Sequence, residues 1–130
     1  MQREPGVYHD HAQVGALLHG WAERHPLCAV ESIGAAADGK DVWLLTITDA
    51  ASGPHDSKPA FWCDGNMHAG EVTGCEACLH FVETLLAQWD GAEPWARDVL
   101  RASTVYVLPR ISPDGAAIET GAAPPVRLTR

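Results

Sequence analysis

Two residues with the chemistry of metal ligands, His68 and Glu71, lie three positions apart near the middle of the chain. A neutral imidazole and a carboxylate are both common zinc donors, and a spacing of three brings side chains to the same side of a helical turn. The pair therefore predicts part of a metal site. It also has an ordinary explanation, because a solvated histidine beside a glutamate that favours the positive end of a helix gives the same pattern.

The segments around this pair are of the kind that position ligands in α/β proteins. Pro59 to Asp64 holds a continuous apolar run, which predicts a strand buried on both faces and central in its sheet. In the loop that follows, Gly65 and Gly70 are expected to allow the backbone turns that direct the ligands inward. Apolar residues at helical spacing from Val72 to Trp89 then predict a long helix. The pair thus lies beyond the carboxyl end of a strand, where open α/β sheets bind ligands.

The other elements complete an α/β pattern. Asp10 and Gln13 predict a capping box for a helix that ends at His25-Pro26, because the residue before proline avoids the helical region. Further elements are predicted over Cys28 to Ile33 (strand), Asp41 to Thr48 (strand), Pro94 to Arg101 (helix) and Thr104 to Leu108 (strand). From Ile111 onward, prolines and glycines predict no regular structure. We therefore expect an α/β fold with a mixed β-sheet flanked by helices.

Length and charge limit the classes of partner. The 130 residues amount to one domain at most, and a net charge of −8 would repel a phosphate backbone, so we expect no nucleic-acid partner. No apolar stretch approaches the roughly 18 residues that span a membrane, so no membrane partner is expected. The segment Met1 to His11 shows no apolar signal region, which predicts a cytoplasmic location.

Four cysteines, Cys28, Cys63, Cys75 and Cys78, are expected to be free thiols in that setting. Cys75 and Cys78 have the spacing of half a zinc or redox site, but no second pair completes a four-thiolate site. Cys75 also fits the apolar stripe of the long helix, so a structural role is favoured.

The segment Lys58 to Gly74, KPAFWCDGNMHAGEVTG, resembles the zinc signature of the M14 family of metallocarboxypeptidases. Other segments resemble that family in the same order along the chain: Tyr8-His9 with the helix to His25-Pro26, the hairpin from Ile33 to Thr48, and the strand and loop from Thr104 to Gly115. This resemblance implies that residues 1–130 are the N-terminal portion of a zinc carboxypeptidase catalytic domain, an incomplete domain of the phosphorylase/hydrolase-like kind. It also implies a zinc-dependent hydrolase that cleaves peptide bonds.

The resemblance further implies a role for individual residues. His68 and Glu71 would bind Zn²⁺, and a histidine further along would be the third protein ligand. Zinc would acidify a bound water and polarise the scissile carbonyl, with a glutamate as general base. Arg127 is the candidate oxyanion donor, although a solvated arginine would show the same pattern. An Asn-Arg pair would bind the terminal carboxylate of a peptide or peptide-like substrate.

Several residues depart from the family pattern. Gly70 lies where many members have an arginine, and Ser112 replaces the asparagine of an Asn-Pro-Asp-Gly loop. The third ligand, the general base and the Asn-Arg pair have no counterpart in this sequence. His55 is the nearest substitute ligand, although a solvated loop histidine is the simpler explanation, and Asp64 is a candidate to orient His68. We therefore expect a truncated domain with weak zinc binding and no turnover by this chain alone.

Two alternatives remain open from the sequence. A zinc deacylase that resembles aspartoacylase or succinylglutamate desuccinylase also uses His-x-x-Glu after a strand, although Asn66 to Ala69 fits the carboxypeptidase pattern better. A non-catalytic remnant would carry the same residues without binding zinc. A truncated domain would also expose an unpaired apolar edge of its sheet, and this predicts self-association.

Overall fold

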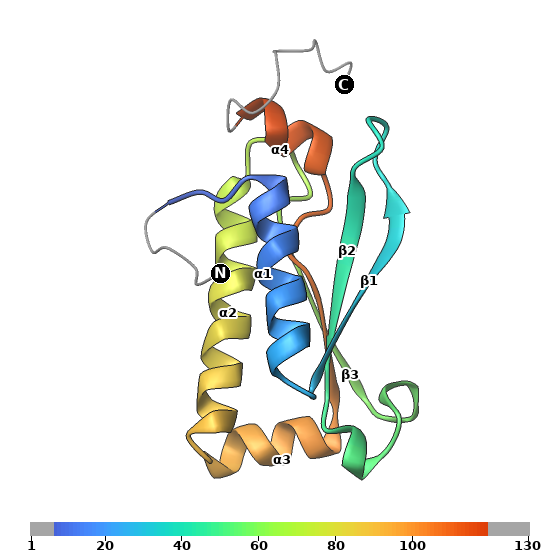
Figure 1. Cartoon of the computed structure of the whole chain (residues 1–130), viewed down its shortest axis with the longest axis vertical. Helices are drawn as coiled ribbons and strands as arrows, with labels where there is room; N and C mark the ends of the chain where they lie inside the picture. Colours follow the sequence, from blue (N-terminus) through green and yellow to red (C-terminus); the bar gives the residue numbers. More distant parts are fainter. Residues whose placement is uncertain (1–6, 120–130) are drawn as a thin grey trace.

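The computed structural model describes residues 7–119, which form a four-stranded mixed sheet and its helices (Figure 1). The strands are β1 (Cys28–Ala35), β2 (Asp41–Ile47), β3 (Ala60–Asp64) and β4 (Thr104–Leu108). The helices are α1 (His11–Arg24), α2 (Val72–Asp90), α3 (Pro94–Ala102) and α4 (Pro113–Glu119), with short 3-10 turns at Ala50–Ser52 and His55–Ser57. The predicted α/β class and mixed sheet are confirmed.

The boundaries of α1 follow from local interactions near its ends. The Asp10 carboxylate accepts a hydrogen bond from the Gln13 backbone N–H at 2.8 Å, and the Gln13 side chain accepts one from the Asp10 N–H at 2.8 Å. This is the predicted capping box, which satisfies backbone donors that a helix start leaves unpaired. Because Pro26 disfavours the helical conformation at the residue before it, His25 is extended and the helix ends at Arg24.

The order of strands across the sheet is β1-β2-β4-β3, which makes β1 and β3 the two edges among the described residues. β2 pairs with both β1 and β4 in antiparallel fashion, whereas β3 runs parallel to β4. The expected central position of β3, with both faces buried, is therefore wrong: Phe61 and Trp62 are 54% and 52% exposed. A short apolar run favours burial of a strand, but it does not show how many neighbours the strand has.

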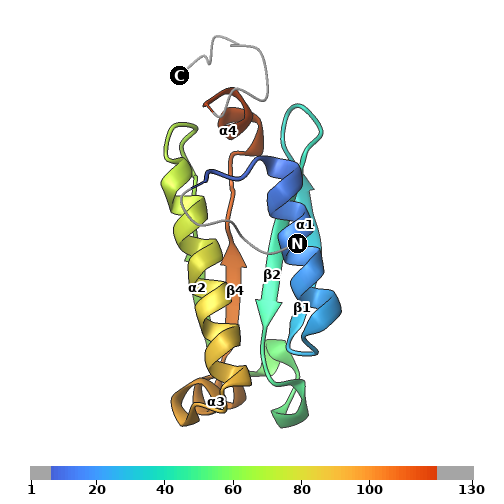
Figure 2. The same ribbon diagram turned by 60° about the vertical axis from the view of Figure 1, so that its left-hand side comes forward.

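One face of the sheet carries the hydrophobic core. The two long helices α1 and α2 cover this face, as Figures 1 and 2 show from two directions. Alternate strand residues point toward them because side chains in a strand alternate between faces. The fully buried members from the inner strands and from α2 are Leu45, Ile47, Val105, Val107, Cys75, Leu79 and Val82. Within residues 7–119, no helix combines the length and the apolar character needed to cross a membrane.

Helix α4 corrects the expectation that regular structure ends at Ile111. Pro113 is the first residue of this helix. A proline suits this position because the backbone N–H that it lacks would have no partner within the helix, and its fixed φ is already helical. Gly115 is buried within it, and a β-carbon there would lie 2.7 Å from the Ala69 β-carbon. The proline and the glycine therefore serve a helix start and a close contact, rather than breaking the helix.

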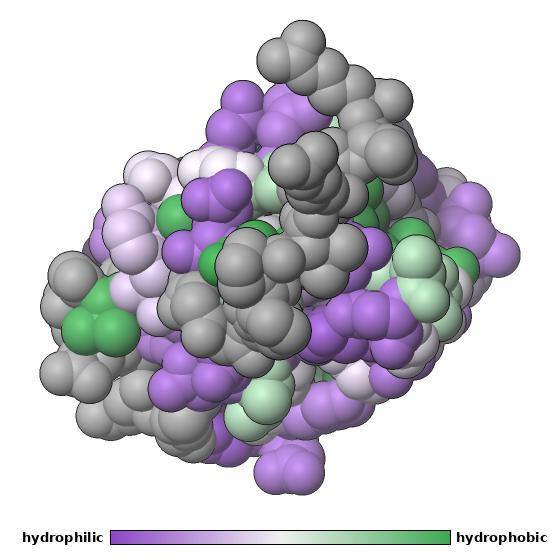
Figure 3. Space-filling model, turned by 90° about the horizontal axis from the view of Figure 1, so that it is seen from above, coloured by the Kyte–Doolittle hydropathy of each residue, from purple (hydrophilic) through white to green (hydrophobic). Residues whose placement is uncertain are grey.

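The parallel pairing of β3 with β4 brings their carboxyl ends to the same edge of the sheet. Gly65 donates to the Leu108 carbonyl at 3.0 Å, and Ile111 and Ser112 donate to the carbonyls of Gly65 and Asn66 at 3.2 and 3.1 Å. The chain after β3 is thus held against the chain after β4. Figure 3 views the molecule from this end, where the described surface is largely hydrophilic with smaller apolar patches.

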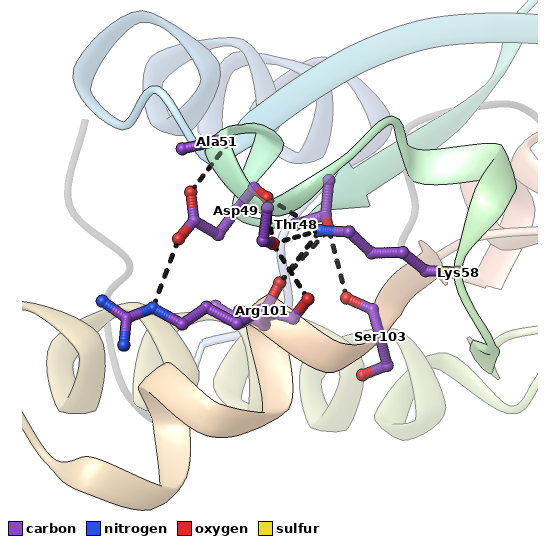
Figure 4. Close-up of polar contacts among 8 residues, drawn as sticks. Thr48, Asp49, Ala51, Lys58, Arg101 and Ser103 are labelled. Carbon is purple, nitrogen blue, oxygen red and sulfur yellow. Dashed lines mark hydrogen bonds and ion pairs between the residues drawn. The ribbon is translucent and has the colours of Figure 1, made fainter.

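The opposite end of the sheet is held by Lys58, which precedes β3 (Figure 4). Its ammonium group donates to Thr48 Oγ1 at 2.8 Å, to the Asp49 carbonyl at 2.7 Å and to Ser52 Oγ at 2.8 Å. The Leu100 carbonyl is a fourth, more distant acceptor at 3.4 Å, so all three N–H donors of the ammonium group have partners. Thr48 Oγ1 in turn donates to the Ser103 carbonyl at 3.1 Å, so Lys58 links the chain before β3 to the end of α3.

We predict that Lys58→Met lowers the free energy of unfolding by about 1–2 kcal/mol, because all the acceptors of this charged donor lose their hydrogen bonds together. Urea denaturation measures this change. Lys40→Met is the matched control, since Lys40 is similarly half-buried but pairs only with Asp38 in the exposed hairpin turn, and it should change stability by less than about 0.5 kcal/mol. Equal effects of the two substitutions would contradict the role given to Lys58.

Candidate metal centre

His68 and Glu71 lie in the loop between β3 and α2, at the edge where the two parallel strands end. His68 Nδ1 lies 3.0 Å from Glu71 Oε2, and the two side chains are 74% and 66% exposed. The residues between them form a turn, not a helix, closed by a hydrogen bond from the Glu71 N–H to the His68 carbonyl at 3.1 Å. The structure therefore brings the two predicted ligands together. That they bind a metal stays a prediction.

The donor atoms suit zinc in both type and separation. Two ligands about 2.0–2.1 Å from a tetrahedral ion lie about 3.4 Å apart, slightly more than the 3.0 Å between the His68 nitrogen and the Glu71 oxygen. A small outward movement of two exposed side chains would thus admit the ion. Glu71 is the N-cap residue of α2, yet its carboxylate makes no capping bond to the described helix. The Glu71 carboxylate contacts His68 instead.

The other candidate residues do not join the pair. His55 Nδ1 lies 2.8 Å from the Tyr106 hydroxyl, and the His55 carbonyl accepts from Thr104 at the start of β4, away from the site. The Asp64 carboxylate accepts from the Trp62 indole at 2.6 Å instead of orienting His68. Arg127 lies outside the described residues. Within residues 7–119, no group of three or more His, Cys, Asp or Glu side chains could hold a metal ion.

The thiols lie on the core side of the loop. Cys75 and Cys78 are buried, and Cys78 Sγ lies 3.7 Å from Cys63 Sγ. Burial raises the pKa of Cys75 to about 11 against a smaller opposing effect of Arg110, and burial likewise raises the pKa of Cys78. A zinc thiolate needs a deprotonated sulfur, so the structural role expected for Cys75 is the one that its surroundings support.

Two buried polar residues under the loop were not singled out from the sequence. Asn66 and Arg110 are each only 2% exposed. The Arg110 Nε donates to Asn66 Oδ1 at 3.0 Å, and Asn66 Nδ2 donates to the carbonyls of His68 at 2.8 Å and Ala69 at 3.4 Å. The sequence feature that could have indicated Arg110 is its place two residues after the apolar strand β4, which ends at the same sheet edge as the strand before His68 and Glu71.

A buried contact between a histidine and a glutamate completes this layer. His9 is 3% exposed, and its backbone N–H donates to Glu76 Oε1 at 2.9 Å while its Nδ1 lies 2.9 Å from Glu76 Oε2. The His9 carbonyl accepts from Arg110 Nη2 at 2.8 Å. Arg110 is therefore connected on one side to residues 65–71, here called the ligand loop because it carries His68 and Glu71. On the other side it is connected, through His9, to α2.

Glycine at position 65 is required by packing. A β-carbon there would lie 2.5 Å from the Gly74 carbonyl oxygen, because the start of the loop crosses the first turns of α2. Gly70 has no such constraint, since the only described atom near its added β-carbon is a Glu119 side-chain carbon at 4.0 Å. Neither Gly65 nor Gly70 has a positive φ, so the backbone turns of this loop do not use the left-handed conformation that glycine adopts readily. The residue with the left-handed conformation is Asn66, at φ 51°.

Comparison with known proteins gives consistent matches. The chain is 27% identical to mouse (Mus musculus) carboxypeptidase D over 115 residues, which is 86% of this chain and 8% of that protein. It is 29% identical to Caenorhabditis elegans carboxypeptidase E over 125 residues, which is 95% of this chain and 26% of that protein. The chain thus spans 8% and 26% of the length of these two relatives.

Solved structures agree on the fold. The carboxypeptidase A of Helicoverpa armigera superposes with a TM-score of 0.75 at 24% identity, over 88% of this chain and 27% of that one. A family model for zinc carboxypeptidases, peptidase M14, matches residues 14–130. The deacylase alternative is not favoured by these matches. Because the family model covers nearly the whole sequence, this chain belongs to the zinc carboxypeptidase family.

Proposed function

We propose that His68 and Glu71 are two ligands of the catalytic zinc in a metallocarboxypeptidase that hydrolyses the C-terminal peptide bond of peptide or peptide-like substrates. The observation that carries this proposal is the 3.0 Å approach of an imidazole nitrogen and a carboxylate oxygen at the shared carboxyl end of β3 and β4. Membership of the zinc carboxypeptidase family supports the metal and the reaction. The high exposure of both side chains leaves the site open to the end of a peptide.

Each part of the mechanism has a stated source. Zinc, when bound, supplies an acidified water and polarises the scissile carbonyl. His68 and Glu71 would hold the ion at the sheet edge, and the turn between them fixes their spacing. Arg127, outside the described residues, is the proposed oxyanion donor. A third ligand, a glutamate base and a carboxylate-binding Asn-Arg pair complete such a site, and residues 7–119 do not group a third ligand with this pair.

We predict that the 130-residue chain binds Zn²⁺ weakly and that either His68→Ala or Glu71→Ala removes this binding. Two ligands hold zinc less tightly than the three of a catalytic site, so losing one leaves no site. Isothermal titration with ZnCl₂ at neutral pH measures the affinity. His55→Ala is the matched control, because this exposed histidine pairs with Tyr106 and should leave zinc binding unchanged. Equal losses in the His55 and His68 variants would contradict the assignment.

We further predict that this chain, tested by itself with saturating zinc, releases no C-terminal residue from peptides above the rate of a zinc-only blank. Water activation by the metal requires a complete ligand set and a general base. Mass spectrometry of a mixed peptide pool detects any shortened product. Zinc-dependent cleavage that disappears in His68→Ala would show that the chain holds a complete site after all.

We also propose that the isolated chain self-associates along β3. This edge strand exposes Phe61 and Trp62, and beside it a groove of about 350 Å³ is lined by apolar side chains of β3, α2 and α3. The largest of these lining residues are Phe61, Phe81 and Trp95. An unpaired strand edge next to an apolar surface is a template for pairing with another chain.

We predict that Phe61→Lys shifts the chain from dimer or higher oligomer to monomer, because a charge in the groove opposes both burial and edge pairing. Light scattering across a concentration series measures the mass. Ile33→Lys is the matched control, since Ile33 is 50% exposed on β1, the other edge strand, and should leave the mass unchanged. A wild-type chain that is monomeric throughout would refute self-association.

A further inference from the structure

The guanidinium of Arg110 is buried beneath the ligand loop. Arg110 is 2% exposed although it lies only two residues past the end of β4. A charge removed from water is unfavourable unless hydrogen bonds replace the lost hydration. Arg110 obtains two such bonds from neutral oxygens, Nε to Asn66 Oδ1 at 3.0 Å and Nη2 to the His9 carbonyl at 2.8 Å, whereas its buried Nη1 has no hydrogen-bond partner among the described residues. Its rigid, planar arrangement of donors is suited to joining two separate acceptors at fixed positions.

Asn66 transmits the position of Arg110 to the ligand loop. Its amide oxygen accepts from Arg110, and its amide nitrogen donates to the His68 carbonyl at 2.8 Å. The Asn66 backbone has φ 51°, a conformation that asparagine tolerates better than most residues other than glycine. The Asn66 carbonyl also accepts from the Ser112 N–H at 3.1 Å. The peptide group that follows His68 is therefore fixed from the buried side, whereas the His68 imidazole is exposed.

The second acceptor connects Arg110 to the helix that follows Glu71. His9 accepts from Arg110 through its carbonyl and binds both carboxylate oxygens of Glu76, in α2, through its backbone N–H and its ring. Since α2 begins at Val72, a fixed α2 fixes the N-cap position that Glu71 occupies. One buried cation is thus hydrogen-bonded to residues that contact the backbone on both sides of the proposed ligand pair.

We propose that Arg110 is the positioning residue of the metal centre, acting through Asn66 on His68 and through His9 and Glu76 on the start of α2. This inference rests on the proposed zinc site. Exposed ligands cannot fix their own geometry, and residues that support ligands from behind commonly change metal affinity by 10- to 100-fold when lost. A role in stability alone would lower the unfolding midpoint but leave the ligand geometry of the folded molecules unchanged.

The test uses the full 130-residue chain with Co²⁺ as the probe. Asn66→Gly keeps the left-handed backbone accessible and removes only the side-chain bridge. Arg110→Lys keeps the charge but has one nitrogen in place of the planar fork, so it cannot join both acceptors in the same geometry. Lys58→Met is the control for general destabilisation, because its contacts lie at the opposite end of the sheet. Urea midpoints show how far each variant is destabilised.

We expect Asn66→Gly and Arg110→Lys each to weaken Co²⁺ binding about tenfold and to change the ligand-field absorption at saturating metal. Lys58→Met should change neither, even at a comparable loss of stability. The variant that carries both substitutions should bind Co²⁺ with about the affinity of whichever single variant has the lower affinity, because both substitutions break the same connection. Unchanged affinity and spectrum in Asn66→Gly would overturn the proposal, and this variant decides the matter if Arg110→Lys does not fold.

Amide exchange without metal separates this inference from the proposed function. The N–H groups of Glu71 and Ser112, which donate to the His68 and Asn66 carbonyls, should exchange at least about tenfold faster in both variants than in Lys58→Met. Normal exchange at these two amides would overturn the positioning role, whatever the metal result. Metal binding that survives His68→Ala would instead overturn the zinc site, and faster exchange would still support Arg110 as the residue that fixes the loop.

Discussion

The parallel pairing of β3 with β4 is the constraint on which the rest of this structure depends. Residues far apart in sequence, Asp64 and Leu108, are register partners at the ends of these strands. Parallel strands end at the same edge, so the two segments that follow them must share one space. Backbone hydrogen bonds from Ile111 and Ser112 to the start of the ligand loop are a direct result. This pairing therefore also places Arg110, which follows β4, beside the loop that carries His68.

This arrangement divides the site into an exposed layer and a buried layer. His68 and Glu71 are exposed, and a hydrogen-bonded or ionic contact between exposed side chains contributes only about 0–1 kcal/mol. Such a pair has too little interaction energy to hold a defined geometry by itself. Asn66 and Arg110 are buried, where an unsatisfied donor or acceptor costs about 1–3 kcal/mol. The relative position of His68 and Glu71 must therefore be set by the buried residues Asn66 and Arg110.

Local signals in the sequence predicted the elements well, and contacts over long range were predicted poorly. The Asp10 cap and the apolar stripe of α2 depend on residues within a few positions of one another, so their positions agree with the structure. The edge position of β3 depends on which strands lie beside it, and no local pattern encodes that. Pro113 was misjudged because proline favours a helix start as strongly as it opposes a helix interior.

The same distinction explains the prediction of the site. His68 and Glu71 are close in sequence, so their spacing predicts their approach. Arg110 is 44 residues from its partner Asn66 and 101 from His9, so its role appears only once the chain has folded. Asp64 was a plausible support by proximity in sequence, but its side chain belongs to the exposed face of β3, where it binds Trp62.

Two cations fix the two ends of the β3 and β4 pair, and their chemistry suits their different tasks. Lys58, before β3, is half-buried and donates to several nearby acceptors through a compact ammonium group, which tolerates small shifts of each partner. Arg110, after β4, is buried and joins two acceptors that must keep a fixed separation. A planar guanidinium imposes such a separation, whereas an ammonium does not. The arginine therefore lies at the end of the sheet that carries the proposed metal ligands His68 and Glu71.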